Sequence, residues 1–137
     1  MTQARSAASQ GYVLGPAEGE HLVHFRDVGN IFIKVGPATG SDSLALGTQQ
    51  VTVGAGIPIH RHLLMDEAFY VLEGRGIFTL NDTRHPFEKG GTIFIPRNAW
   101  HGFANPDHCS CSGSWRLLAW MAFSATPAIR PGSRQSS

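Results

Sequence analysis

Two histidines and a glutamate stand in an otherwise apolar stretch, GIPIHRHLLMDEAFYVLEG, which covers residues 56–74. Alternate side chains of a strand point to the same face, so His60 and His62 project together while Arg61 points away. If the next strand, which Glu67 opens, folds back beside the first, its carboxylate can approach both imidazoles. Neutral imidazoles and a carboxylate can coordinate a divalent ion, whereas burying them without a partner costs several kcal/mol.

The elements that must position these groups are short strands. Turn clusters rich in Gly, Pro, Asn and Asp, among them residues 81–91, separate eight apolar or alternating runs, and no sustained helical pattern is present. The eight runs are residues 30–35, 43–53, 57–62, 67–74, 76–80, 91–96, 100–105 and 115–123. Many short antiparallel strands must protect their edges, which favours an all-β closed barrel or a double-sheet jelly roll.

Size and composition indicate one such domain. The chain has 137 residues, 42% of them apolar and 15% charged, with sixteen Gly and eight Pro. We expect an N-terminal arm over residues 1–20, a barrel over 21–123 and a C-terminal tail over 124–137. A net charge of +1 without a basic run argues against nucleic acid as a partner. Neither a signal peptide nor a membrane span is indicated, so we expect a soluble, cytoplasmic protein.

Two spaced motifs connect this pattern to a known family. The first reads G-x5-H-x-H-x4-E-x6-G over residues 54–74, and the second reads G-x5-P-x-N-x2-H-x3-N from Gly90, with a third imidazole at His101. Together they resemble the two conserved motifs of the cupin superfamily. The second departs at Asn98, where the family usually has Gly, but Asn tolerates left-handed backbone geometry better than most residues. The fifteen residues between Gly74 and Gly90 resemble the spacing in small single-domain cupins.

The resemblance implies a double-stranded β-helix, the jelly-roll barrel of cupins, with one metal ion inside it. It also implies the ligands: His60, His62, Glu67 and His101. Imidazole and carboxylate suit several divalent ions, so iron, manganese, nickel, copper, cobalt and zinc all stay open. Four ligands leave about two positions of an octahedral ion for water, substrate or dioxygen.

Within cupins, IPIHRH and DEAFYVLEG resemble the small quercetin-dioxygenase-like group. That likeness implies a metal-dependent dioxygenase, an oxidoreductase acting on a small enol or phenol, with iron among the candidate ions and with Glu67 as both a ligand and the catalytic base. The alternatives are a non-redox isomerase, lyase or hydrolase, and a cupin that binds a small molecule without catalysis. The resemblance also implies a homodimer.

Residues outside the ligand set are not predicted to bind the metal. Tyr70 and Asp66 are expected to face away from the metal, and Cys109, Cys111 and His108 to lie in a hairpin loop rather than at a second metal site. Histidines 21, 24 and 85 are predicted to be solvated or locally hydrogen-bonded. Six apolar residues are candidates for a pocket that holds a hydrophobic ligand: Phe69, Phe78, Phe94, Trp100, Phe103 and Met121.

Overall fold

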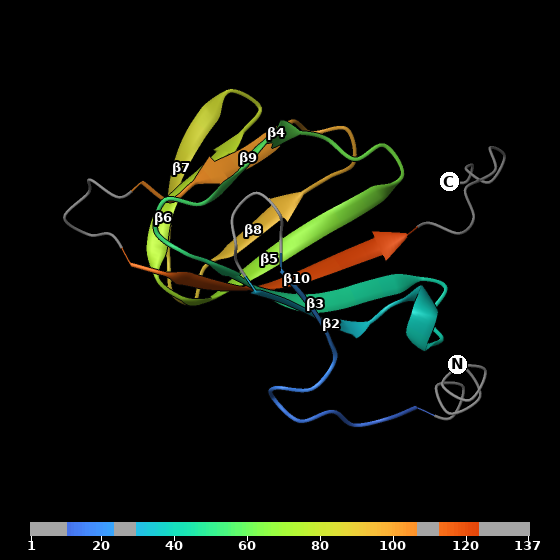
Figure 1. The fold of residues 1–137 in the computed structure, drawn as a ribbon. Helices are drawn as coiled ribbons and strands as arrows, with labels where there is room; N and C mark the ends of the chain where they lie inside the picture. The colour runs from blue at the N-terminus through green and yellow to red at the C-terminus, as the bar shows by residue number, and fades with distance from the viewer. Residues whose placement is uncertain (1–10, 24–29, 107–112, 124–137) are drawn as a thin grey trace, which may run out of the picture.

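The fold is a sandwich of two antiparallel sheets that face each other (Figure 1). The computed structural model describes residues 11–23, 30–106 and 113–123. Ten strands and one short 3-10 helix, η1, follow in chain order: β1 Glu20–Val23, β2 Asn30–Val35, η1 Pro37–Thr39, β3 Leu44–Val51, β4 Gly56–His60, β5 Met65–Glu73, β6 Arg75–Leu80, β7 Thr83–Glu88, β8 Thr92–Ile95, β9 His101–Ala104 and β10 Trp115–Phe123. The predicted all-β, jelly-roll class is confirmed.

The two sheets differ in size. The larger one has the order β1-β2-β3-β10-β5-β8 and the smaller one the order β4-β9-β6-β7. Each sheet therefore combines strands from both halves of the chain, and the motif strands β5 and β4 lie in opposite sheets. Both edge strands of the smaller sheet contain a proline, Pro58 in β4 and Pro86 in β7. Within the described ranges, no helix is long and apolar enough to span a bilayer.

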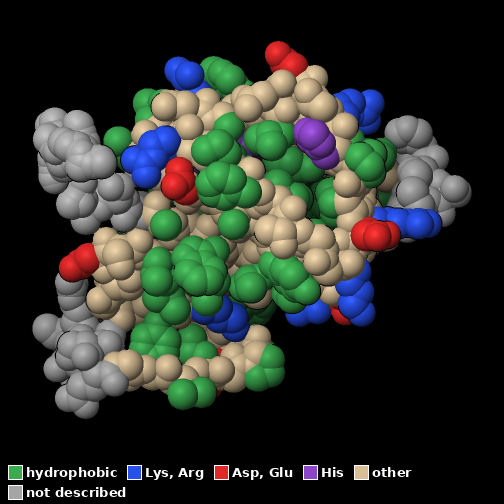
Figure 2. Space-filling model, turned by 180° about the vertical axis from the view of Figure 1, so that it is seen from behind, with side chains coloured by type: hydrophobic (Ala, Val, Ile, Leu, Met, Phe, Trp, Pro, Cys, Tyr) green, Lys and Arg blue, Asp and Glu red, His purple; other side chains and the backbone are tan. Residues whose placement is uncertain are grey.

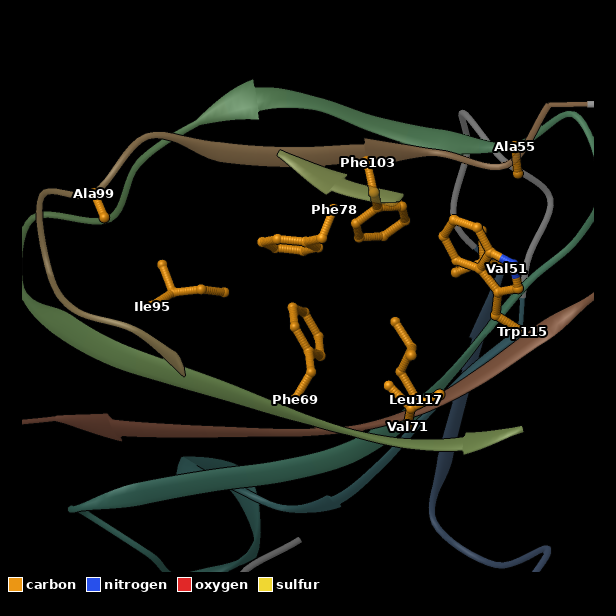
Figure 3. Packing of buried hydrophobic residues seen from close by; sticks show 10 residues of the cluster. All are labelled: Val51, Ala55, Phe69, Val71, Phe78, Ile95, Ala99, Phe103, Trp115 and Leu117. Atoms are coloured by element: carbon orange, nitrogen blue, oxygen red, sulfur yellow. The ribbon is translucent and has the colours of Figure 1, made fainter. Parts of the chain in front are cut away.

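The core lies between the sheets and combines aliphatic side chains with four aromatic rings (Figure 3). Trp115 is 1% exposed and packs its ring edge-on against Phe87 and at a tilt against Phe103. Gly76 makes room for this indole, because a Cβ at Gly76 would lie 2.2 Å from the Trp115 Cζ2. The other core residues are Val51, Ala55, Phe69, Val71, Phe78, Ile95, Ala99, Phe103 and Leu117.

Hydrophobic side chains also reach the surface. Figure 2 shows them grouped across the middle of the face seen from behind, with most charged side chains nearer its outline. Among the exposed hydrophobic side chains, Trp120 is 51% exposed and Tyr70 is 45% exposed. Tyr70 thus points away from the interior, as predicted.

Two strands differ from the sequence prediction. The prediction placed residues 81–91 in a turn cluster, which is wrong, because Thr83–Glu88 form β7. Asn81 and Asp82, with φ of 47° and 69°, make the two-residue turn that joins β6 to β7. The strand β1 was not predicted; it begins at Glu20, one residue before the expected start of the barrel, and is exposed throughout.

Candidate metal centre

Four chemically competent side chains meet between the two sheets. His60 is the last residue of β4 and lies opposite His101, the first residue of β9. His62 follows β4 by two residues, outside the strand in which it was predicted. Glu67 lies in β5 of the larger sheet and points inward. The structure therefore brings together all four residues that the sequence singled out.

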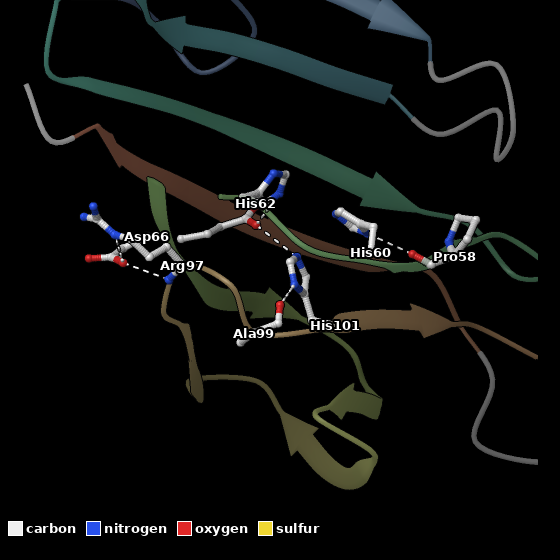
Figure 4. A network of polar contacts seen from close by, with 8 residues as sticks. Pro58, His60, His62, Asp66, Arg97, Ala99 and His101 are labelled. Atoms are coloured by element: carbon white, nitrogen blue, oxygen red, sulfur yellow. Dashed lines mark hydrogen bonds and ion pairs between the residues drawn. The ribbon is translucent and has the colours of Figure 1, made fainter. Parts of the chain in front are cut away.

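The three imidazoles form a tight cluster, as Figure 4 shows. One ring nitrogen from each of His60, His62 and His101 lies within 4.8 Å of the others. The ring centroids are separated by 4.9 Å for His60 and His62, and by 4.3 Å for His60 and His101. Oε1 of Glu67 lies 3.3 Å from Nε2 of His62 and 3.4 Å from Nε2 of His101. The carboxylate thus contacts two of the three histidines directly.

Backbone carbonyls fix the orientation of two of these rings. Nδ1 of His60 is 2.8 Å from the carbonyl oxygen of Pro58, and Nδ1 of His101 is 2.9 Å from that of Ala99. A carbonyl only accepts, so each Nδ1 carries the proton and donates it. In the neutral ring, Nε2 then presents its lone pair to the centre, which is the state a metal-binding histidine needs.

Burial and the shared carboxylate move the pKa values of two histidines in opposite directions. Burial lowers the pKa of His62, and the neighbouring His60 and His101 add to this, while Glu67 opposes it. Burial also acts to lower the pKa of His101, but the contact with Glu67 and the bond with the Ala99 carbonyl outweigh it, so the pKa is raised. Without a bound cation, a proton on His101 is therefore the charge that Glu67 stabilises.

A turn holds the loop that carries His62. The backbone N–H of Asn98 donates to the carbonyl oxygen of His62 at 2.7 Å, and Asn98 has a left-handed φ of 75°. The backbone N–H of Arg97 donates to Oδ1 of Asp66 at 2.9 Å, and burial of Asp66 is slight. This bond and the Arg97 guanidinium hold the pKa of Asp66 below its usual value. Asp66 faces away from the metal centre as predicted, but its role in the turn was missed.

Aromatic rings enclose the inner side of the cluster. The ring of Phe78 lies nearly parallel to that of His101, with centroids 6.2 Å apart, and also packs against Phe69 and Phe103. Met121 lies directly opposite Glu67 in the β10–β5 register. These four members of the predicted pocket do lie on the inner side of the sheets.

Two other members of the predicted pocket point elsewhere. Trp100 is 47% exposed, and its ring lies under the Arg61 guanidinium at 4.7 Å, so its predicted place beside the metal is wrong. Trp100 immediately precedes His101, and adjacent side chains of an extended chain point to opposite faces. Phe94 is 58% exposed and pairs with Ala68 on the outer side of the larger sheet.

The remaining predicted histidines do not join the cluster. His21 stacks on Phe32 and shares a hydrogen bond with Asn30, as a locally bonded histidine was predicted to do. His85 is exposed in β7. Four residues of interest lie outside the described ranges: His24, His108, Cys109 and Cys111.

The donor set fits a divalent cation. His101 is 2% exposed and Glu67 5% exposed, and Nε2 of His101 forms no hydrogen bond among the described residues, only the 3.4 Å contact with Oε1 of Glu67. A buried polar atom without a hydrogen bond is costly, and three imidazole nitrogens converging near a carboxylate are ligands that divalent transition metals accept. A cation bound here would satisfy that nitrogen.

A family match covers the part of the chain that contains the candidate metal ligands. Residues 47–112, which include all four side chains, match the cupin domain family. This match and the fold support the cupin superfamily. A 55-residue segment of this chain is 40% identical to an uncharacterised protein of Methanocaldococcus jannaschii and covers 40% of the chain and 44% of that relative. The match thus spans less than half of the curated relative.

Solved structures share the cupin fold. The Cnp3 cupin domain of Schizosaccharomyces pombe has a TM-score of 0.60 at 21% identity, over 69% of this chain and 64% of that one. The polyketide cyclase RemF of Streptomyces resistomycificus has a TM-score of 0.70 at 22% identity, over 87% of this chain and 83% of that one. At these identities the structural likeness establishes the fold alone. The chemistry of this protein has to be inferred from the residues of the site.

Proposed function

We propose that this cupin domain binds one divalent transition-metal ion through His60, His62, Glu67 and His101 and is a metal-dependent oxygenase of small enols or phenols. The observation that supports the metal most strongly is the buried Nε2 of His101, which forms no hydrogen bond and has only the 3.4 Å contact with Oε1 of Glu67. The ligands come from both sheets, so the closed sandwich itself assembles the site. Imidazole and carboxylate ligands leave iron, manganese, nickel, copper, cobalt and zinc as candidate ions.

When bound, such an ion would acidify a coordinated hydroxyl and offer open positions to substrate and dioxygen. The protein's own residues supply the rest. Pro58 and Ala99 hold His60 and His101 with Nε2 toward the centre. Oε1 of Glu67 is the base that accepts the hydroxyl proton of the substrate, and its contacts with His62 and His101 keep it at the site.

The apolar surroundings favour an organic substrate with a planar ring. Phe69, Phe78 and Phe103 pack against one another on the inner side of the cluster, and Met121 lies opposite Glu67 in the β10–β5 register. Aromatic faces and edges attract other rings, and their burial excludes bulk water that would compete for the proton on Glu67. A small enol or phenol combines an acidic hydroxyl with such a ring.

The metal assignment is tested by elemental analysis of protein purified without added metal. His62→Ala should lower the metal content to a small fraction of the wild-type value, because it removes one ligand from a partly exposed position. His85→Ala is the matched control, since His85 is also an exposed histidine but lies away from the cluster. Equal metal content in all three proteins would refute the site.

The reaction class is tested separately, with the metal-loaded protein and a panel of enols and flavonols. Oxygen uptake that depends on the substrate supports the oxygenase. Turnover under strict anaerobiosis instead supports the non-redox alternative, in which the ion acts as a Lewis acid for isomerisation or elimination. Saturable binding without product in either atmosphere supports a cupin that binds its ligand without catalysis.

A further inference from the structure

An open cavity lies at the side of the sandwich, and it is separate from the four candidate metal ligands. It has a volume of about 1040 Å³ and opens between the β6–β7 hairpin and β8. β7 and β8 are edge strands of opposite sheets, so no strand closes this side. None of the four candidate metal ligands lines it. We call this space the lateral cavity.

The wall of the lateral cavity is apolar and partly aromatic. Phe78, Leu80 and Phe87 line it from the hairpin, and Ile93 lines it from β8. These four also belong to the core or pack against it, so the inner wall of this open cavity is continuous with the core between the sheets. A wall with this composition favours a flat aromatic molecule over a flexible polar one.

His85 and Thr92 are hydrogen-bonding side chains among those that line the cavity. His85 lies opposite Phe78 in the β6–β7 register, so its side chain is on the cavity side of the hairpin. It is exposed, and no hydrogen bond or ion pair of its imidazole occurs within the described part of the chain. Arg75 and Glu88, which also line the cavity, lie opposite each other and balance in charge. The mouth therefore favours a neutral ligand that carries a hydroxyl.

Phe78 is the wall shared by the lateral cavity and the metal centre. It lines the cavity and lies nearly parallel to the ring of His101. Interiors are closely packed, so a molecule that presses on Phe78 alters the surroundings of His101. Occupation of the cavity should be detectable at the histidine.

We propose that the lateral cavity binds a neutral, planar aromatic molecule with a hydroxyl group that hydrogen-bonds to His85. This inference goes beyond the proposed oxygenase and does not depend on it. The site needs neither a metal nor turnover, and it lies on the far side of Phe78 from the candidate ligands.

The test uses 2-naphthol as the probe and metal-free full-length protein, with binding measured by equilibrium dialysis. Wild-type protein should bind 2-naphthol saturably, with one molecule per chain. His85→Trp should fill the mouth and raise the dissociation constant by at least about tenfold, or ~1.4 kcal/mol. Arg84→Trp is the matched control, because Arg84 precedes His85 in β7 and its side chain lies on the opposite face of the hairpin. It should leave the dissociation constant within about twofold of wild type.

Three results would overturn the proposal: binding that does not saturate, unchanged binding in His85→Trp, or an equal loss in Arg84→Trp. Thermal unfolding of both variants shows whether either has lost the fold, and His85→Ala then serves as a milder second variant with an expected loss of about threefold. Bound 2-naphthol should also shift the ring NMR signals of His101 but not those of His21. Because the protein is metal-free throughout, a negative result here is distinct from a failure of the metal site.

Discussion

The backbone N–H of Asn98 and the carbonyl oxygen of His62 are joined by a hydrogen bond of 2.7 Å. Neither side chain takes part, yet the bond ties the loop carrying His62 to the turn that precedes His101. This main-chain bond therefore fixes the first motif, which carries His62, next to the second motif, which carries His101. The geometry of the candidate metal centre therefore depends on the backbone conformation of this turn.

Asn98 is therefore replaceable by glycine but not by a β-branched residue. Its φ of 75° lies in the left-handed region, which glycine adopts freely and valine adopts with difficulty. We expect Asn98→Val to lower the free energy of unfolding by about 1–2 kcal/mol and to reduce metal content. Asn98→Gly should retain both. Denaturant unfolding and elemental analysis check this, and equal behaviour of the two variants would contradict it.

Asp66 should stabilise the same turn in a pH-dependent way. Its pKa is lowered by the Arg97 backbone N–H and the Arg97 side chain, so its contribution is present above the unfolded pKa near 3.8 and is lost as pH falls through the lower, folded value. The carboxylate is 38% exposed, which limits the effect of Asp66→Asn to at most about 1 kcal/mol at neutral pH. Urea unfolding at pH 7 and pH 3 measures it, with Asp42→Asn as the control. A loss that is larger at pH 3 than at pH 7 would show that the sign is wrong.

Glu67 should control the protonation of His101 in the metal-free protein. The carboxylate raises the pKa of His101 against the effect of burial, so Glu67→Gln should lower that pKa. The raised pKa stabilises the fold below the unfolded value near 6.5, and this contribution is lost as pH rises through the folded value. Wild type should therefore exceed Glu67→Gln in stability mainly at acidic pH.

Ring NMR titration of His101 and urea unfolding across pH check this behaviour. Glu73→Gln is the matched control, because Glu73 lies at the far end of the same strand and contacts Arg116 instead. An unchanged His101 titration in Glu67→Gln would mean that the 3.4 Å contact has no electrostatic effect.

Gly76 should be intolerant of any side chain. A Cβ would lie 2.2 Å from Cζ2 of Trp115, a rigid ring that is itself held by Phe87 and Phe103. We expect Gly76→Ala to lower the free energy of unfolding by about 1–3 kcal/mol, as overpacking does. Gly113→Ala is the control, because its Cβ would meet nothing within 4 Å. Similar melting temperatures for the two variants would refute the packing argument.

Side-chain parity explains most of what the sequence predicted correctly. His60, Glu67 and Phe69 face inward and Tyr70 outward because alternation along a strand follows directly from backbone geometry. β7 escaped prediction because it is an edge strand, and its exposed Thr83, Arg84 and His85 resemble a loop in composition. The bond between Asn98 and His62 was not predictable, since a contact between main-chain atoms leaves no trace in residue type.

Prolines in both edge strands of the smaller sheet restrict how this protein can assemble. Pro58 and Pro86 have no N–H to offer an incoming strand, whereas the larger sheet's edges, β1 and β8, contain no proline. A second copy that joins by strand addition must therefore extend the larger sheet. We expect a dimeric solution mass with hydrogen-exchange protection gained in β1 or β8; protection gained in β4 or β7 would contradict this. Intermolecular backbone pairing at the edges of the smaller sheet, and with it open-ended aggregation through that sheet, is therefore disfavoured.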